Sequence, residues 1–240
     1  MANSVTSNET IKRLLTDIKE IMKCPLTSHG IYYEHNETDM LKGQALIIGP
    51  KDTPYEGGYY LFEFLFPTNY PYSPPKITYC TNDGVTRFNP NFYKCGKVCL
   101  SILNTWRGEQ WSSCQSISTV LLVLCTTLNE QPLLNEPGFT ETSEELPKYN
   151  AIIRYKNLEI ATLNMLQNDW VCTQFSTFLP IMKTHFLSSY EKIIEFIEKE
   201  IVKNKPTCIK TNIYLMCVVA DYKSLKQSMI KYYDTIKEFN

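Results

Sequence analysis

The uneven distribution of glycine constrains the fold of this 240-residue chain more than any other feature of its sequence. All nine glycines lie between Gly30 and Gly138, and prolines become rare beyond Pro137. Glycine and proline mark tight turns and interrupt regular elements. We therefore expect a turn-rich α+β region up to about Gly138 and a mainly helical region after it.

The composition is that of an ordinary globular protein. Hydrophobic residues make up 43% of the chain and charged residues 20%, which excludes wholesale disorder. A net charge of −1 gives no reason to expect nucleic acid or an anionic membrane as a partner. The first ten residues contain no basic patch followed by an apolar run, so we expect no secretory signal.

The nine cysteines are an odd number, and without an export signal we expect reduced thiols and a cytoplasmic or nuclear protein. Cys95 and Cys99 form a single C-x3-C spacing, and none of the three histidines lies at zinc-ligand spacing from a cysteine. A redox or metal protein built on these two cysteines is therefore a weaker alternative. We predict no metal site.

Short strand-like segments separated by turn residues occupy the first third of the chain. The predicted strands are Gly30–Glu34, Leu41–Ile48, Tyr59–Phe66 and Lys76–Cys80. Consecutive short strands with tight connections indicate a four-stranded antiparallel meander. The Phe66–Pro75 segment contains four prolines, which remove amide donors and fix φ, so we expect a stiff loop there.

Two helices flank this predicted sheet. Ser7 or Asn8 can cap the first, which has an apolar stripe at helical spacing, with Lys12, Arg13 and Lys19 largely on its other faces. The second, Ile117–Leu128, is apolar and contains neither glycine nor proline.

The last ninety or so residues predict three or four further helices. Phe186–Lys203 has an apolar stripe typical of a helix packed on its neighbours. Ile213–Ala220 is apolar on all sides, so we expect it to be buried. We hypothesise that this region docks on the first part of the chain.

The stretch Arg87–Leu103 carries the chemistry. Asn89-Pro90-Asn91 favours a turn and Gly96 allows a second reversal. Cys99 follows this irregular stretch and precedes apolar residues, so we expect an exposed thiol on a rigid base. The absence of a nearby histidine argues against a Cys/His dyad. Such a thiol suits the acceptance of an acyl group that is already activated.

The sequence resembles the ubiquitin-conjugating enzymes across roughly residues 8–140. The resemblance rests on several motifs in order: Thr53–Gly58, the Phe66–Pro75 loop, Asn89–Asn91, Gly96–Leu103, and Trp111 before the Ser116–Leu122 segment. Most members have His-Pro-Asn where this chain has Asn89-Pro90-Asn91. Three features look like the Z type of the family: this difference, the longer Asn104–Trp111 loop and the Asn135–Phe139 segment. Members of that type have a long C-terminal extension, which fits the C-terminal region of this chain. The resemblance implies a catalytic domain at 1–148 and a helical extension at 149–240.

The resemblance also implies roles for individual residues. Cys99 would hold the modifier's C-terminus as a thioester, and Asn91 would either stabilise the tetrahedral oxyanion or brace the catalytic loop. Asn89 and Pro90 belong to the structural motif, with the Asn89 amide replacing the hydrogen bonds of the usual histidine.

Other roles transfer less directly from the family. Glu136 or Asn135 would orient the incoming lysine, or their loop would merely cap the site.

Partner-binding surfaces are expected on the first helix and on two loops. Lys12, Arg13 and Lys19 match the family's activating-enzyme face, whereas Tyr72 matches a loop that ligases contact. Ser112 and Ser113 match the second ligase loop, although Ser113 replaces its usual proline. The expected partners are ubiquitin or a ubiquitin-like modifier, an activating enzyme, a ligase and protein substrates.

No cofactor is expected, because ATP is used by the activating enzyme and the chain has no phosphate-binding glycine-rich motif. A non-catalytic relative that binds ubiquitin or scaffolds ligases is the competing interpretation. Such relatives usually lack the acceptor cysteine.

Overall fold

A four-stranded antiparallel sheet in the order β1-β2-β3-β4 forms the centre of the computed structural model, which describes residues 6–203 and 207–237. The strands are β1 Ile31–His35, β2 Lys42–Ile48, β3 Tyr59–Leu65 and β4 Lys76–Tyr79. Each strand pairs with its neighbour in sequence, and Ala45 of β2 lies opposite both Tyr33 and Phe62. The predicted meander is confirmed, with boundaries within one residue of those expected.

The two predicted flanking helices are also confirmed. Helix α1, Asn8–Lys23, begins at Ser7, whose hydroxyl accepts the Thr10 amide at 3.0 Å. Helix α2, Ile117–Thr127, begins at Ser116, which forms a capping box with Thr119. Both caps satisfy amides that the first helical turn leaves without intrahelical partners.

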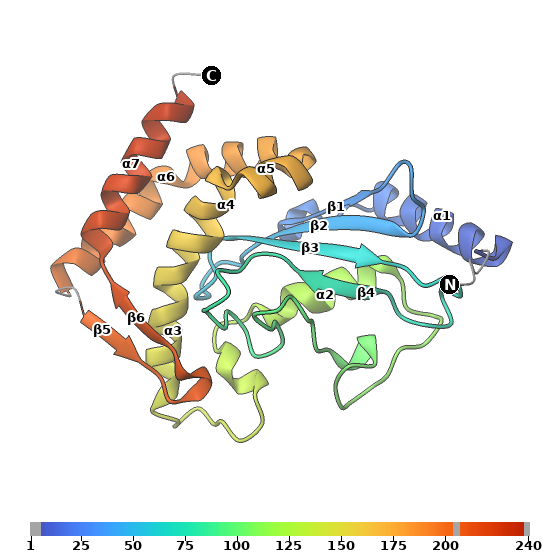
Figure 1. Cartoon of the computed structure of the whole chain (residues 1–240), viewed down its shortest axis with the longest axis horizontal. Helices are drawn as coiled ribbons and strands as arrows, with labels where there is room; N and C mark the ends of the chain where they lie inside the picture. The colour runs from blue at the N-terminus through green and yellow to red at the C-terminus, as the bar shows by residue number, and fades with distance from the viewer. Residues whose placement is uncertain (1–5, 204–206, 238–240) are drawn as a thin grey trace.

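The C-terminal region gathers against the end of the sheet where β3 begins (Figure 1). Its helices are α3 Glu145–Lys156, a π-helix Asn157–Asn164, α4 Met165–Gln167, α5 Asp169–Gln174, α6 Leu179–Lys203 and α7 Tyr222–Lys237. The expected helical extension is therefore present. The boundary expected between residues 148 and 149 falls inside α3.

The extension also contains a β-hairpin that the sequence analysis missed. Strands β5, Thr207–Lys210, and β6, Cys217–Ala220, pair in antiparallel register. The expectation that Ile213–Ala220 is buried throughout is wrong, because Val219 is 58% exposed whereas Val218 is 7% exposed. Alternation of this kind is the two-residue period of a strand with one covered face.

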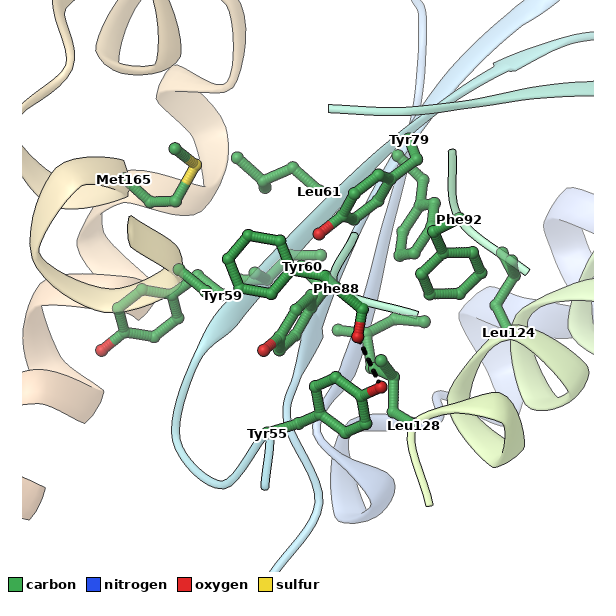
Figure 2. Close-up of a cluster of buried hydrophobic side chains, with 14 of the residues drawn as sticks. Tyr55, Tyr59, Tyr60, Leu61, Tyr79, Phe88, Phe92, Leu124, Leu128 and Met165 are labelled. Atoms are coloured by element: carbon green, nitrogen blue, oxygen red, sulfur yellow. Dashed lines mark hydrogen bonds between the residues drawn. The ribbon is translucent and has the colours of Figure 1, made fainter. Parts of the chain in front are cut away.

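The extension and the sheet share one hydrophobic core (Figure 2). The Tyr59 hydroxyl donates to the Met182 carbonyl at 2.8 Å, and the Tyr60 hydroxyl donates to the Asn157 side chain at 2.6 Å. The glycine at Gly58 permits this contact, since a Cβ there would lie 1.9 Å from Asn157 Oδ1. The docking hypothesis for the extension is therefore confirmed.

Within the described residues, no helix combines the length and apolar character needed to cross a membrane.

Candidate functional site

The segment from residue 87 to residue 103 folds as a loop that returns on itself beside the sheet. The chain reverses near Gly96, whose φ of 86° lies in the left-handed region that glycine adopts without strain. The reversal brings Cys99 against Asn91. The Cys99 amide donates to the Asn91 carbonyl at 2.9 Å, and the Asn91 side chain donates to the Cys99 carbonyl at 2.8 Å. A reciprocal pair of hydrogen bonds thus joins the two predicted catalytic residues.

The Asn91 side chain braces the loop in this arrangement. It is 9% exposed, and its Nδ2 holds the Cys99 backbone. Its Oδ1 is buried and has no hydrogen-bond partner among the described residues. A side-chain amide has two N–H donors, and this bond accounts for one of them. Of the two alternatives for Asn91, bracing of the loop is the contact that the structure shows, and the oxyanion role stays a prediction.

Asn89 occupies a fully buried structural position. Its Nδ2 donates to the Tyr55 hydroxyl at 2.9 Å and to the Thr127 carbonyl at 2.8 Å. Its Oδ1 accepts the Asn91 amide at 2.9 Å. Both ends of the amide are thus satisfied, so Asn89 ties the Asn-Pro-Asn turn to the end of α2.

Two buried tyrosines hold carbonyls just before this turn. The Tyr149 hydroxyl donates to the Arg87 carbonyl and the Tyr55 hydroxyl to the Phe88 carbonyl, both at 2.7 Å; the second bond is drawn in Figure 2. Burial raises the pKa of both tyrosines well above the ordinary value, so their hydroxyls keep the protons that they donate. Tyr149 belongs to α3, so the helix that leads into the extension contributes directly to the loop.

Arg87 holds the next two carbonyls. Its Nε donates to the Asn89 carbonyl at 3.1 Å and its Nη2 to the Pro90 carbonyl at 2.7 Å. Its guanidinium carbon lies 3.4 Å from the centre of the Tyr93 ring and 5.0 Å from that of Tyr214. Side-chain donors therefore fix four successive carbonyls from residue 87 to residue 90.

Cys99 itself is 2% exposed, and the expectation of an exposed thiol is wrong for this structure. Its neighbours Val98 and Leu100 belong to the hydrophobic core, whereas Cys99 is not part of that core cluster. Cys99 lies between two residues that are also buried, Val98 and Leu100, so the burial of this position depends on how the loop packs against the core. By contrast, Cys95 and Cys114 are exposed.

Asn135 and Glu136 lie close to the turn, although they are held by different partners. The Asn135 Nδ2 donates to the Thr127 carbonyl at 3.2 Å, and this is the carbonyl that Asn89 also binds. The Glu136 carboxylate accepts the Tyr214 hydroxyl at 2.6 Å. Burial and this bond raise the pKa of Tyr214. A predicted catalytic acid is thus in contact with the extension.

The predicted partner-binding residues on α1 and the proline-rich loop face solvent. Lys12 and Lys19 are exposed, and Tyr72 is 64% exposed. The Tyr72 hydroxyl donates to the Glu9 carboxylate at 2.6 Å, so this loop contacts α1.

The predicted second ligase loop, which contains Ser112 and Ser113, contacts both α1 and the proline-rich loop. Ser112 and Ser113 are exposed, and the neighbouring Trp111 indole donates to the Pro71 carbonyl at 2.6 Å. Arg13 donates to the Ser113 carbonyl at 2.5 Å. Its guanidinium is therefore engaged within the chain, whereas Lys12 and Lys19 are available to a partner.

The sequence analysis did not assign roles to Arg87, Tyr149 or Tyr214. Arg87 lies two residues before the turn, and a basic residue so close to Asn89-Pro90-Asn91 was the available signal. Tyr149 and Tyr214 gave no signal, because nothing local in the sequence indicates that they reach the loop.

No cluster of three or more His, Cys, Asp or Glu side chains that could hold a metal ion occurs in residues 6–203 and 207–237.

A family model described as ubiquitin-conjugating enzyme matches residues 13–156, from α1 to the end of α3. The chain therefore belongs to the ubiquitin-conjugating enzyme family, and its sheet and flanking helices form the UBC domain of that family. The resemblance deduced from the motifs is confirmed.

Curated relatives include two proteins named ubiquitin-conjugating enzyme E2 Z. The Xenopus tropicalis protein is 41% identical over 192 residues, covering 79% of this chain and 60% of its own length. The Homo sapiens protein is 41% identical over 189 residues, which cover 78% of this chain and 52% of that protein's length. The chain thus spans about half to three-fifths of these relatives, and its resemblance to the Z type is confirmed.

A third relative is a much larger protein, the Homo sapiens dual E2 ubiquitin-conjugating enzyme/E3 ubiquitin-protein ligase BIRC6. It is 34% identical over 215 residues, which cover 82% of this chain and 4% of that protein. Because these alignments cover about four-fifths of the chain, they include part of the extension as well as the region that the family model matches.

Proposed function

We propose that this protein accepts ubiquitin or a ubiquitin-like modifier from an activating enzyme as a thioester on Cys99. It then transfers the modifier to a substrate lysine or to a ligase. The observation that carries this proposal is the reciprocal hydrogen bonding of Cys99 and Asn91 on a loop whose backbone carbonyls are held by side chains. Such a loop positions a thiol and an amide donor rigidly beside one another.

The chemistry consists of two acyl transfers. In the first, the Cys99 sulfur attacks the modifier's thioester carbonyl, a new C–S bond forms, and the activating enzyme's cysteine leaves as a thiolate. In the second, a lysine amine attacks the new thioester, an amide bond forms, Cys99 leaves as a thiolate and the amine loses a proton. Asn91 donates to the tetrahedral oxyanion, which is typically worth about 3–4 kcal/mol. Glu136, or else Asn135, orients the amine.

A charging assay tests the first transfer. Incubation with activating enzyme, ATP and ubiquitin is expected to give an adduct that disappears on treatment with a thiol reductant. Cys99→Ser is expected to give a thiol-stable ester or no adduct, whereas Cys95→Ser should charge normally. Absence of any adduct with every modifier in a panel of ubiquitin and ubiquitin-like proteins would favour the non-catalytic alternative.

The burial of Cys99 adds a second test. The residue as a whole is 2% exposed, and attack requires access to the thiol, so we expect the sulfur to react mainly when its surroundings open transiently. A small alkylating reagent is therefore expected to modify the exposed Cys95 and Cys114 at least about tenfold faster than Cys99. Equal rates, measured by mass spectrometry, would show that the thiol is accessible in solution.

The partners and the location follow from the same proposal. Lys12 and Lys19 form part of the face for the activating enzyme, and Tyr72, Ser112 and Ser113 form part of the face for a ligase. The proposed location is the cytoplasm, the nucleus or both, where the nine cysteines stay reduced. The extension helps to select the modifier or its activating enzyme, and charging of point variants with several modifiers tests this selection.

A further inference from the structure

Arg87 is a buried cation without a carboxylate partner. It is 8% exposed, and none of the ion pairs within the described residues includes it. Burial of a charge is unfavourable unless polar or aromatic groups compensate for the lost water. Here the carbonyls of Asn89 and Pro90 and the rings of Tyr93 and Tyr214 provide that compensation.

Tyr214 reaches Arg87 from the tip of the β5–β6 hairpin. Both Tyr214 and Leu215 have positive φ values, 57° and 51°, a region that residues with a side chain seldom adopt. The Glu145 carboxylate of α3 holds the tip by accepting the amides of Asn212 at 2.8 Å and Ile213 at 3.3 Å. The unfavourable backbone is thus maintained by specific contacts, and it places the Tyr214 ring on the guanidinium.

The same hairpin makes two further contacts, one with Glu136 and one with the backbone of the catalytic loop. The Tyr214 hydroxyl donates to Glu136 at 2.6 Å. The Arg87 amide lies 3.4 Å from the Met216 sulfur, which accepts it. The extension therefore contacts Arg87 through Tyr214 and Met216, and Tyr93 of the catalytic loop contacts its guanidinium as well.

We propose that Arg87 is a positioning residue for acyl transfer, and that the hairpin tip, through Tyr214, keeps it in place. The guanidinium fixes the Asn89 and Pro90 carbonyls, and these peptides determine where the Asn91 side chain lies relative to Cys99. The extension thereby takes part in the transfer step. This inference rests on the proposed function, since it concerns the same thioester.

The test measures discharge of the preformed Cys99–ubiquitin thioester of the full-length chain to free lysine, after ATP is removed. Only folded enzyme becomes charged, so the rate constant per charged molecule does not depend on how much protein is folded. Three variants are compared with wild type: Tyr214→Ala, Tyr214→Phe and Arg87→Lys. Leu215→Ala is the matched control, because Leu215 shares the left-handed turn but is 86% exposed.

Tyr214→Ala and Arg87→Lys are expected to lower the maximal discharge rate about tenfold, because small displacements of catalytic groups are costly. The lysine concentration at half-maximal rate should not change. Tyr214→Phe keeps the ring on Arg87, so its rate is expected to fall no more than about threefold. Leu215→Ala should behave as wild type.

Other outcomes separate the inference from the proposed function. Wild-type discharge by Tyr214→Ala overturns the inference while leaving the proposed function intact, because that variant must first be charged. Equal losses of discharge rate in Tyr214→Phe and Tyr214→Ala also overturn it. Both variants remove the hydroxyl that donates to Glu136, so the effect would then come from that bond and not from the ring on Arg87. Failure of wild type to charge at all rejects the proposed function instead. If Arg87→Lys does not fold, the two Tyr214 variants still decide the question.

Discussion

Two arginines brace loops in this protein, and they do so by different means. Arg13 donates to the carbonyls of Ser113 and Gln115, both at 2.5 Å, in the predicted ligase loop. Arg87 donates to the carbonyls of Asn89 and Pro90 in the catalytic loop. Both therefore use the fork of a guanidinium to fix two carbonyls close together in sequence.

Different groups compensate for the positive charges of the two guanidiniums. Arg13 pairs with Asp17 one turn along α1, at 2.7 Å, so the sequence of one helix encodes that brace. Arg87 depends on aromatic rings, one of which comes from the hairpin of the extension. The charge of Arg13 is therefore paired within one helix, whereas part of the compensation at Arg87 requires that the extension be docked.

The largest effect on stability is expected at Arg13. Asp17 is only 2% exposed, and Arg13→Met leaves its carboxylate buried with Tyr70 as the remaining hydrogen-bond partner. Breaking such a pair should lower the free energy of unfolding by about 3 kcal/mol. Asp17→Asn in the same chain removes the unpaired charge and should restore more than half of the loss. Urea denaturation checks both values, and no recovery would show that the unpaired carboxylate is not the main cause of the destabilisation.

Arg87→Met is expected to cost less, about 2 kcal/mol, because it leaves one carbonyl unsatisfied rather than a buried charge. The Asn89 carbonyl also accepts the Phe92 amide at 3.0 Å, so the Pro90 carbonyl is the one that loses its partner. Urea denaturation measures the change. A loss larger than that of Arg13→Met would reverse the comparison.

A double-mutant cycle distinguishes the two braces directly. Tyr214→Ala and Arg87→Met should show a coupling energy of about 1 kcal/mol, because their side chains are in contact. Tyr214→Ala and Arg13→Met should be additive, since the contacts of Arg13 within residues 6–203 and 207–237 are with α1, the second loop and Tyr70, and Tyr214 is not among them. Equal coupling in both cycles would mean that Tyr214 acts through global stability alone.

The same distinction explains how far the sequence could predict this protein. Strand and helix positions were predictable, because the periodicity of apolar residues and caps such as Ser7 and Ser116 are local signals. The pairing of Cys99 with Asn91 was implied by the resemblance to the family, which gave Asn91 a role at the catalytic loop. The burial of Cys99 was not implied, because it depends on how the loop folds back.

The contribution of the extension to the site could not be predicted from the local sequence either. In strand β6, Val218 and Ala220 are buried whereas Cys217 and Val219 are exposed. In the sequence these four residues form a short apolar run, which does not by itself indicate a strand. Tyr214 acts on Arg87 through tertiary contact alone. Such contacts between distant segments leave no trace in spacing or composition.

The smallest expected effect concerns pH and the attachment of the extension to the sheet. Burial lowers the pKa of His185 on α6. The ring faces hydroxyl groups, with Nδ1 3.2 Å from the Tyr59 hydroxyl and Nε2 3.4 Å from that of Ser189. The folded state therefore favours neutral imidazole. Its stabilising contribution is complete above the ordinary histidine pKa of about 6.5 and is lost as the pH falls through the lowered folded value.

Wild type should accordingly lose up to about 1 kcal/mol more than His185→Gln between pH 7 and mildly acidic pH. The measurement is urea denaturation at a series of pH values. His35→Gln is the matched control, because burial also lowers the pKa of His35 but His35 lies in β1, away from the extension. Hydrogen exchange then locates the change: acid should loosen α6 in wild type and in His35→Gln, but not in His185→Gln. Identical behaviour of all three proteins would show that acid does not act at the junction of α6 and the sheet.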